Sequence, residues 1–530
     1  MVQMFTSKQA FLTFRVLPVL LILLFGALGL LSCLSGNIVP PEMGKYADEW
    51  PAANKNYSNT RATQDSVISS QNVQTLRVAW TFALTGFSEW GAAATNPLIL
   101  NNTVYLQDLK SNVFAIDLST GKLLWKKEYN LDNFGPNGPA VGWDKLFIPK
   151  GHYEVAALNL TNGKELWSTR LSDKSNVGID IQLVAYNNMV YVSTVPGSTN
   201  ADFYTGGGYG VIHALEQKTG KVVWKFNTVD SEEIWGNPSV NSGSGAWYPP
   251  AIDTDTGITY WGTGNPAPVP GTEEFPGGSS RPGPNLCSDS MLALDSSTGK
   301  LLWYKQVKPH DLFDLDFQSS PILTTAKING KQTKIVIGSG KLGKVYAFDR
   351  KSGEIYWQTP VGLHQNDELT ELPAGTTRVL PGPDGGVLTP MACTDGVLYV
   401  PVVNHFGDYT PTEFIESTYD ESAGTGELVA LDVSTGKPLW SKSFDSITIG
   451  AATVVNDLVF TSTLDGMIYA LDKTTGEEVW NYQAPGGING WPAVSGDCII
   501  FPIGLGPKAQ LIVFQSGKAA AGVPSQIQSR

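Results

Sequence analysis

The chain has 530 residues and a formal net charge of −13, with 36 Lys and Arg against 49 Asp and Glu. A chain this acidic, with no cluster of basic residues, is not expected to bind nucleic acid. It also contains no Cys-x-x-Cys-His motif, so no covalently attached c-type haem is expected on it.

The N-terminal segment has the composition of an export signal. Lys8 and Arg15 precede an almost uninterrupted apolar run over 16–31, which is short for a membrane span and typical of a signal-peptide core. The run ends in Leu-Leu-Ser-Cys33, which looks like the lipobox at which bacteria attach lipid to the Cys and cleave before it. We therefore expect a signal peptide over 1–32 and a lipid anchor at Cys33. The protein would then be exported and held at a membrane on the periplasmic or cell-surface side; the alternative is a plain secretory signal or an anchor helix with an incidental Cys.

Seven copies of one eleven-residue phrase follow along the chain. In each copy a Gly lies six residues after the first Ala, and a Trp lies four residues after that Gly. Such a repeat indicates an architecture of repeated units. The copies end at Trp125, Trp167, Trp224, Trp303, Trp357, Trp440 and Trp480.

Each copy predicts a β-hairpin. An apolar stretch such as 291–294 is typical of a buried strand, and Asp-x-x-Thr-Gly is typical of a tight turn. The second strand ends in a Trp that one hairpin cannot cover, so we expect it to pack against a neighbouring sheet. A further strand precedes most copies, as at 103–106 and 189–192. Three or four strands per unit predict a β-propeller with tryptophan-docking repeats.

The two ends of the chain predict the number of blades. Strands at 498–502 and 510–514 follow the last copy without a further hairpin, while 76–80 has a Trp-ending strand without a turn before it. If the N-terminal strand completes the C-terminal blade, no open sheet edge remains. We therefore predict an all-β, eight-bladed propeller over 46–516, with a tether over 33–45 and a flexible tail over 517–530.

Two segments interrupt the repeats. The first runs from Trp247 to Gly-Thr-Gly-Asn265-Pro-Ala-Pro, and the second is Pro-His310-Asp311-Leu-Phe-Asp314-Leu-Asp316-Phe. Carboxylates crowded at 311, 314 and 316 repel one another unless a cation or a role as a base holds them. In a strand, residues 314 and 316 would point to the same side.

With the repeats and the opening Glu-Trp-Pro…Asn59-Thr-Arg61, these two segments resemble the eight-bladed quinoprotein alcohol dehydrogenases, which use pyrroloquinoline quinone (PQQ). The resemblance covers about residues 46–515. It implies PQQ in the central channel, bound with calcium or a lanthanide ion. It also implies oxidation of a small or polymeric alcohol to an aldehyde or ketone. Because the chain lacks a haem motif, electrons would pass to an external cytochrome c or quinone.

The resemblance implies a role for each of five residues. Trp247 corresponds to the floor on which the quinone stacks, and Asn265 to an amide ligand of the metal. Asp314 matches the carboxylate that binds the metal and acts as general base on the substrate hydroxyl. Asp316 matches an extra metal-binding carboxylate of the lanthanide-using branch, and Lys341 the basic residue that contacts the quinone oxygens. Hard cations prefer oxygen ligands of these kinds.

The chain departs from the family pattern at two places. The metal-binding Glu of a compact Gly-Ala-Glu loop is replaced by a longer segment in which Asp202 is the nearby carboxylate. The vicinal Cys pair that caps the quinone is replaced by Asn133 and Phe134. The remaining cysteines, at 287, 393 and 498, have no metal-binding spacing; one pair could form a disulfide, or all could be buried thiols.

Every candidate residue also has a structural interpretation. Trp247 could pack between blades and Asn265 could form a turn. The two aspartates could lie in a solvated loop or bind a structural calcium, and Lys341 could lie on the surface. His310 is interpreted as a structural hydrogen-bonding residue. For the whole chain, the alternative to an enzyme is a non-catalytic scaffold that resembles the outer-membrane assembly lipoprotein, which has the same propeller repeats.

Overall fold

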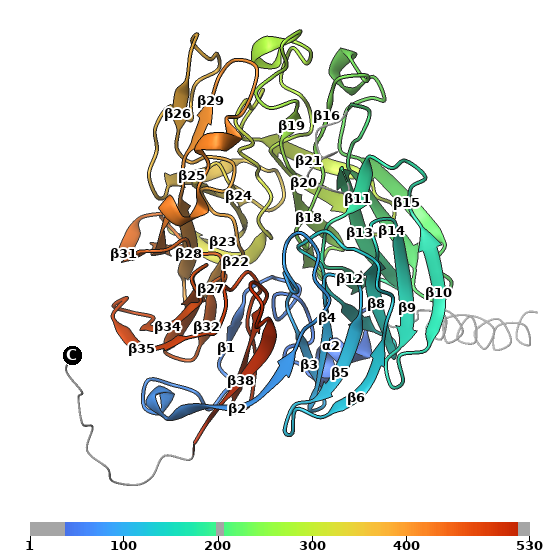
Figure 1. Ribbon diagram of the computed structural model, residues 1–530, viewed down its shortest axis with the longest axis vertical. Coiled ribbons are helices and arrows are strands. Elements are labelled where there is room, and N and C mark those ends of the chain that lie inside the picture. The colour runs from blue at the N-terminus through green and yellow to red at the C-terminus, as the bar shows by residue number, and fades with distance from the viewer. Residues whose placement is uncertain (1–37, 198–205, 518–530) are drawn as a thin grey trace, which may run out of the picture.

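The computed structural model describes residues 38–197 and 206–517, and within them eight sheets of four or five strands form a ring (Figure 1). The colours follow the chain around the ring from blue to red, so sheets that are consecutive in sequence are neighbours in space. The molecule is an eight-bladed β-propeller, and this confirms the predicted fold class. The expected signal peptide, Cys33, Asp202 and residues 518–530 of the expected tail lie outside the described residues.

The first four blades take up the chain from residue 98 to residue 306, and their strands pair in antiparallel order. In blade 3 two short strands both pair with β13. The strands are β3 (Leu98–Leu100), β4 (Thr103–Gln107), β5 (Val113–Asp117) and β6 (Leu123–Lys127) in blade 1; β7 (Ala140–Gly142), β8 (Lys145–Lys150), β9 (Glu154–Asn159) and β10 (Glu165–Arg170) in blade 2; β11 (Val177–Ile179), β12 (Val184–Tyr186), β13 (Met189–Pro196), β14 (Val211–Glu216) and β15 (Val222–Asn227) in blade 3; and β17 (Ala251–Asp253), β18 (Ile258–Gly262), β20 (Ser290–Asp295) and β21 (Leu301–Gln306) in blade 4.

The last four blades include two strands from the N-terminal part of the chain. One of them, β1 in blade 7, pairs in parallel with β32. The strands are β22 (Ile322–Ile328), β23 (Lys331–Gly338), β24 (Lys344–Asp349) and β25 (Ile355–Pro360) in blade 5; β27 (Ala392–Thr394), β28 (Val397–Asn404), β30 (Thr425–Asp432) and β31 (Pro438–Phe444) in blade 6; β1 (Ala62–Thr63), β32 (Thr453–Val455), β33 (Leu458–Ser462), β34 (Met467–Asp472) and β35 (Glu478–Gln483) in blade 7; and β2 (Leu76–Ala83), β36 (Ala493–Ser495), β37 (Cys498–Ile503) and β38 (Gln510–Ser516) in blade 8.

The ring closes through blade 8, where β2 forms the outer strand. It runs antiparallel to β38, with Trp80 opposite Val513. This pairing confirms that the N-terminal strand completes the C-terminal blade. It also covers an edge of β38 that would otherwise expose unpaired backbone groups.

The repeated tryptophans join each blade to the next. The indole Nε1 of Trp224 donates to the carbonyl of Ser296 in blade 4 at 3.0 Å, and its ring lies against Gly299. A Cβ at Gly299 would approach the ring to 2.5 Å, and the residue has φ +71°, so this turn requires glycine twice over. The predicted docking is therefore confirmed. Equivalent bonds of 2.7–3.2 Å join Trp80 to Leu118, Trp125 to Leu160, Trp167 to Gln217, Trp303 to Arg350, Trp357 to Val433, and Trp440 to Lys473.

Trp480, the last tryptophan of the repeat, packs differently. The blade that follows it has no Thr-Gly turn, and its ring instead lies edge-on to Phe514, with centroids 5.6 Å apart. The repeat thus loses its docking partner where the chain closes the ring.

Two small sheets project from the same side of the ring, at the top of Figure 1. Each pairs a strand from the segment that precedes a blade with a strand inserted within that blade, and the two blades are blades 4 and 6. Short helical turns lie in these and other connections. The strands are β16 (Ser242–Gly243), β19 (Pro266–Ala267), β26 (Thr377–Val379) and β29 (Gly407–Tyr409), and the helices are α2 (Pro41–Lys45), η1 (Val73–Thr75), η2 (Ile234–Gly236), η3 (Pro276–Gly278), η4 (Glu416–Thr418) and η5 (Glu421–Ala423).

Part of the segment predicted as a tether over 33–45 is described, and it contains the short helix α2 (Pro41–Lys45). From Ile38 onward the chain packs against the propeller, and α2 places the Glu42 carboxylate against the backbone N–H groups of Trp143 and Asp144 at 3.0 and 2.7 Å. A helix of five residues is too short to show a helical period, so the sequence pattern carried no sign of it.

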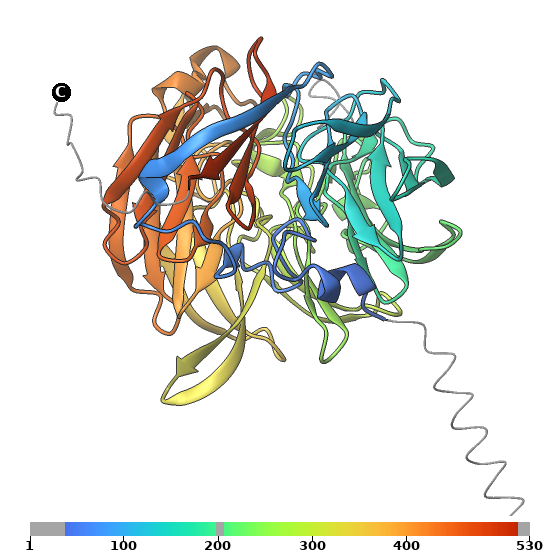
Figure 2. The ribbon, with the colours of Figure 1, turned by 90° about the horizontal axis from the view of Figure 1, so that it is seen from below.

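Between α2 and β2 the chain crosses one face of the ring, as the dark blue segment of Figure 2 shows. The amide of Asn59 donates to the carbonyls of Pro249 and Pro321, which lie just before blades 4 and 5. The Arg61 guanidinium donates to the carbonyls of Ala452 and Pro492, just before blades 7 and 8. This segment therefore ties distant blades together near the axis.

The described cysteines, Cys287, Cys393 and Cys498, are buried free thiols. Of the two possibilities, a disulfide between one pair or buried thiols throughout, the structure has buried thiols at all three positions. Among the helices of the described residues, none has the length and apolar character needed to cross a membrane.

Candidate active site

Five residues singled out from the sequence meet at one rim of the ring. Trp247 precedes the first strand of blade 4, and Asn265 follows the second. Asp314 and Asp316 precede the first strand of blade 5, and Lys341 follows the second. In an antiparallel blade, the start of the first strand and the end of the second lie at the same end. The fold thus brings together side chains that are up to 94 positions apart, from 247 to 341.

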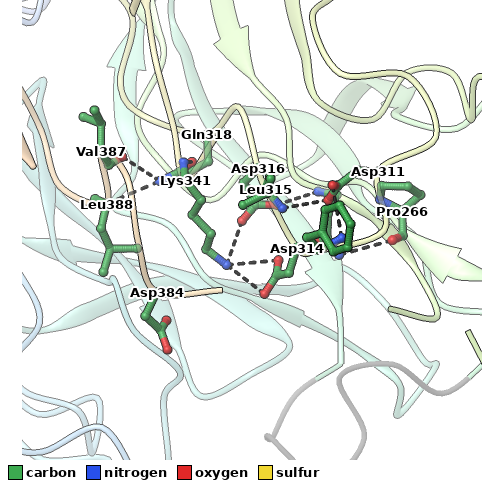
Figure 3. A network of polar contacts seen from close by, with 12 residues as sticks. Pro266, Asp311, Asp314, Leu315, Asp316, Gln318, Lys341, Asp384, Val387 and Leu388 are labelled. Carbon is green, nitrogen blue, oxygen red and sulfur yellow. Dashed lines mark hydrogen bonds and ion pairs between the residues drawn. The ribbon is translucent and has the colours of Figure 1, made fainter. Parts of the chain in front are cut away.

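The Lys341 ammonium lies between the two carboxylates, as Figure 3 shows. Its Nζ is 3.1 Å from both oxygens of Asp314 and 3.0 Å from Oδ2 of Asp316. Lys341 is 9% exposed, so the interpretation as a surface lysine is wrong. Its backbone is held as well, because its N–H donates to Oε1 of Gln318 at 3.1 Å.

The acidic segment forms a loop rather than a strand, yet both aspartates reach the same ammonium. Asp314 and Asp316 are 9% and 2% exposed, which excludes a solvated acidic loop. Asp311 has a different role: its carboxylate accepts hydrogen bonds from the N–H groups of Phe313 at 3.1 Å and Leu315 at 2.6 Å. Asp314 itself has φ +60°, a conformation that costs energy outside glycine and is concentrated at functional sites.

Asn265 is fixed to the same carboxylate pair through its backbone. Its N–H donates to Oδ1 of Asp316 at 2.5 Å, while its side-chain amide N–H donates to the carbonyl of Pro266 at 3.2 Å. The preceding Gly264 allows this approach, because a Cβ there would lie 2.9 Å from Oδ1 of Asp316. The amide oxygen is the remaining polar atom of the Asn265 side chain.

Trp247 lies next to the charged group and is not one of the inter-blade tryptophans. Lys341 Nζ lies 5.4 Å from the centre of its ring. Tyr248 follows at a centroid distance of 4.8 Å, and Trp491 lies 5.4 Å beyond Tyr248. The result is an aromatic floor from blades 4 and 8 beside the carboxylates.

Lys341, Asp314 and Asp316 together carry one more negative charge than positive charge when all three are ionised. Burial raises the pKa of Asp314, and the charge of Lys341 opposes that rise. Burial alone would lower the pKa of Lys341, but the charges of Asp314 and Asp316 outweigh it and raise the pKa. One ammonium can balance one of the two carboxylates, so the group as described favours additional positive charge.

Sequence reasoning missed two further carboxylates near this group. Asp180 follows β11 and is 4% exposed. Asp384 lies near Lys341 in Figure 3, and its carboxylate accepts a hydrogen bond from the Tyr419 hydroxyl. An Asp inside the apolar stretch Val-Gly-Ile-Asp180-Ile was a usable signal, because a charged residue in such a stretch needs a partner. Asp384 stands in a Pro-Gly-rich loop, which gave no comparable signal.

Asn133 and Phe134, which the resemblance sets at the place of the family's Cys pair, are buried near blade 1. Asn133 is 1% exposed, with its N–H bonded to the Leu109 carbonyl at 2.9 Å. Phe134 packs edge-on against Trp90, with centroids 5.8 Å apart. Aromatic packing therefore holds the Phe134 side chain in place. His310 bonds Asn285 through Nδ1 at 3.2 Å, as a structural residue would.

Two family models match the chain, in regions that overlap only over residues 182–201. The model for the β-propeller domain of glucose, ethanol and alcohol dehydrogenases matches residues 182–361. The model for the outer membrane protein assembly factor BamB matches residues 51–201 and 381–525. All five residues of the group lie inside the dehydrogenase match.

Known relatives are similar over most of their length. The putative dehydrogenase XoxF of Paracoccus denitrificans is 28% identical, over 84% of this chain and 84% of the relative. A lanthanide-dependent methanol dehydrogenase of Methylacidiphilum fumariolicum is 27% identical, over 93% of this chain and 88% of the relative. The quinohaemoprotein alcohol dehydrogenase ADHIIG of Pseudomonas putida HK5 has the same fold, with a TM-score of 0.79, 20% identity, and coverage of 93% of this chain and 84% of that chain.

The residues present suit a hard cation and a polar ring system in most respects. Oxygen donors from Asp314, Asp316 and Asn265 share one rim, as calcium and lanthanide ions require. Buried polar atoms without a hydrogen-bond partner among the described residues include Oδ1 of Asp180 and Nε1 of Trp491, and a bound polar group would satisfy them. Within the described ranges, however, no three His, Cys, Asp or Glu side chains form a ready metal cluster.

Proposed function

We propose that this chain is a quinoprotein alcohol dehydrogenase, a PQQ- and metal-dependent enzyme that oxidises an alcohol to an aldehyde or ketone, because its central part matches the dehydrogenase propeller model and its relatives are named as dehydrogenases of this kind. The metal would be calcium or a lanthanide ion, and one relative is named a lanthanide-dependent methanol dehydrogenase. The alcohol, small or polymeric, would enter from the rim that carries Asp314.

One observation carries the proposal over the scaffold alternative. The assembly-factor match stops at residue 201 and resumes at residue 381, whereas the dehydrogenase match spans the interval that holds Trp247, the two aspartates and Lys341. A scaffold has no use for two buried carboxylates that share one ammonium, because burying such charges is costly. Their presence supports an enzyme.

Asp314 would act as the general base. Its carboxylate is held by Lys341 at 3.1 Å and would accept the proton of the substrate hydroxyl as the alcohol carbon is oxidised. Lys341 fixes the direction of that carboxylate and would balance negative charge that develops next to it. A base in this setting works mainly through its position.

Asn265 and Asp316 would supply oxygen ligands to the cation, and Trp247 would support the ring of PQQ. When bound together, the cation would act as a Lewis acid and PQQ would take up the two electrons removed from the alcohol. The protein's part is to position both groups and to exclude water, as the burial of all three charged side chains indicates.

Electrons would leave for a separate acceptor. Since the chain has no motif for covalent haem, we propose an external cytochrome c or a quinone as that acceptor. The acidic net charge of −13 favours a partner with a basic surface.

The test is reconstitution of the purified full chain with PQQ plus calcium, and in parallel with PQQ plus a lanthanide. We expect retention of PQQ through gel filtration, seen by its absorbance, and oxidation of alcohols coupled to an artificial electron-accepting dye. Protein without PQQ is the control. Failure to retain PQQ with either metal would refute the dehydrogenase and favour the scaffold.

We also propose that the protein is exported and anchored by lipid at Cys33, on the periplasmic or cell-surface side. The support is the sequence of the N-terminal segment, which lies outside the described residues. Replacing Cys33 with Ser is expected to move the protein from the membrane fraction to the soluble fraction, because the lipid attaches to the thiol. Cell fractionation followed by immunoblotting measures the distribution. Unchanged membrane retention of the variant would contradict the anchor.

A further inference from the structure

Asp180 is a buried carboxylate to which the site, as described above, assigns no role. Its side chain is 4% exposed, and its Oδ1 has no hydrogen-bond partner within residues 38–197 and 206–517. Its neighbours Ile179 and Ile181 belong to the apolar core between blades 2, 3 and 4. An unpartnered carboxylate in such a place is costly unless a ligand compensates it.

Backbone contacts place Asp180 beside the group around Lys341. It directly follows β11, where Ile179 pairs with Thr194 of β13. The segment that leads to Trp247 packs on that strand, because a Cβ on Gly245 would lie 3.0 Å from Cγ1 of Val195 and 3.1 Å from the Thr194 carbonyl oxygen. Asp180 and the Trp247 segment therefore lie against the same end of β13.

The same path continues to the acidic pair. The N–H of Gly264 donates to the Gly245 carbonyl at 2.8 Å, and the next residue, Asn265, donates its N–H to Oδ1 of Asp316 at 2.5 Å. The charges that act on the Asp180 carboxyl are those of Lys341 and Asp316, and burial raises its pKa. Burial raises the pKa of Tyr248, which packs on Trp247, and the charge of Asp180 raises it further.

We propose that Asp180 is a direct oxygen ligand of the cation and takes the place of the family's missing Glu. This inference rests on the proposed function. With Asp180, three carboxylates and one ammonium act on one another electrostatically, and a hard cation of charge two or three would compensate the surplus. Among the described residues the three do not form a ready metal cluster, so the cation would draw them together. Asp180 follows the first strand of blade 3, whereas Asp314 and Asp316 precede the first strand of blade 5, so the cation would be held between blades.

The experiment measures metal binding without PQQ. Terbium(III) is added to the purified full chain, and its luminescence is excited through tryptophan, since Trp247 lies beside the carboxylates. Asp180→Asn keeps the shape and removes the charge. We expect terbium affinity to fall at least about 10-fold to 100-fold, because even partners outside the ligand set cost that much in known metal sites.

Three variants serve as comparisons. Asp173→Asn removes the same charge seven residues earlier, from a fully exposed side chain, and should leave the affinity unchanged. Asp202→Asn tests the carboxylate favoured by sequence alone, and it should also bind normally. Asp316→Asn should lose binding, because Asp316 contributes to the same cation site.

The outcomes separate this inference from the proposed function. If the unaltered protein binds no terbium, the cation-dependent function fails and this inference fails with it. If the unaltered protein binds and Asp180→Asn binds equally well, Asp180 is not a ligand while the function stands. A loss of binding in Asp202→Asn alone would show that Asp202, and not Asp180, is the ligand.

Protein stability provides a second measurement. Without metal, Asp180→Asn should melt at the same temperature as the unaltered protein or higher, because an unpartnered charge has been removed from the interior. Terbium should then raise the melting temperature of the unaltered protein only. A clear loss of stability in the metal-free variant would show that Asp180 has a structural role instead, and Asp180→Ser should repeat the result if Asn does not give folded protein.

Discussion

Replacing Asp314 with Asn is expected to reduce kcat/KM for alcohol oxidation by about 10²-fold to 10⁴-fold, the usual contribution of a general base. The amide has nearly the same shape, and its oxygen can still accept a hydrogen bond from Lys341, which now contacts Asp314 at 3.1 Å. It cannot take up the proton of the substrate hydroxyl. Steady-state kinetics with the reconstituted protein measures the loss, and PQQ absorbance measures cofactor retention separately.

The control for this change is Asp255→Asn. Asp255 lies in the turn between β17 and β18, and its exposed carboxylate pairs with Lys334 at 2.9 Å. Removing this charge should leave kcat/KM unchanged. If Asp314→Asn retained more than about a tenth of the activity while binding PQQ normally, Asp314 would not be the base.

Replacing Arg61 with Met is expected to lower the free energy of unfolding by about 3–5 kcal/mol, the cost of leaving a buried polar network without its partner. Arg61 is completely buried, and burial lowers its pKa to about 9, so it remains charged at neutral pH. Its guanidinium donates to the side chains of Asn96 at 2.6 Å and Thr453 at 2.7 Å. The thioether can donate to neither.

The effect should be large because Arg61 links segments that are far apart in sequence. Besides those side chains it binds the carbonyls of Ala452 and Pro492, so one residue near the axis joins the N-terminal segment to blades 1, 7 and 8. Urea unfolding followed by tryptophan fluorescence measures the change. Arg77→Met on the exposed face of β2 is the control and should shift stability by no more than about 0.5 kcal/mol. An equally small shift for Arg61 would contradict its role as a link.

Much of the fold was predictable because the repeat is local. The Thr-Gly turn requires a glycine where the preceding blade's tryptophan covers the backbone, as at Gly299. Each copy of the repeat therefore contains the residues that dock it to its neighbour. The closing strand was predictable for the same reason: Trp80 ends a strand that has no turn of its own. The helix α2 was not, because five residues do not make a pattern.

The candidate site was only partly predictable. The motifs around Asn265 and Asp314 are contiguous in sequence, and they indicated both positions. Lys341 looked as much like a surface residue as a site residue until the structure placed its ammonium between Asp314 and Asp316. For the carboxylate that replaces the family's metal-binding Glu, the sequence indicated Asp202. Contacts across three blades lead us to propose Asp180 instead.

By itself, the sequence determined the eight blades, the tryptophan docking and the closure of the ring, because these depend on contacts between segments that lie next to each other in the repeat. Only the tertiary structure decided which charged side chains share one environment, because Asp180, Asp316 and Lys341 come from separate loops whose distance depends on how whole blades pack around the axis. Charge compensation is a property of that packing, and no local pattern in the chain records it.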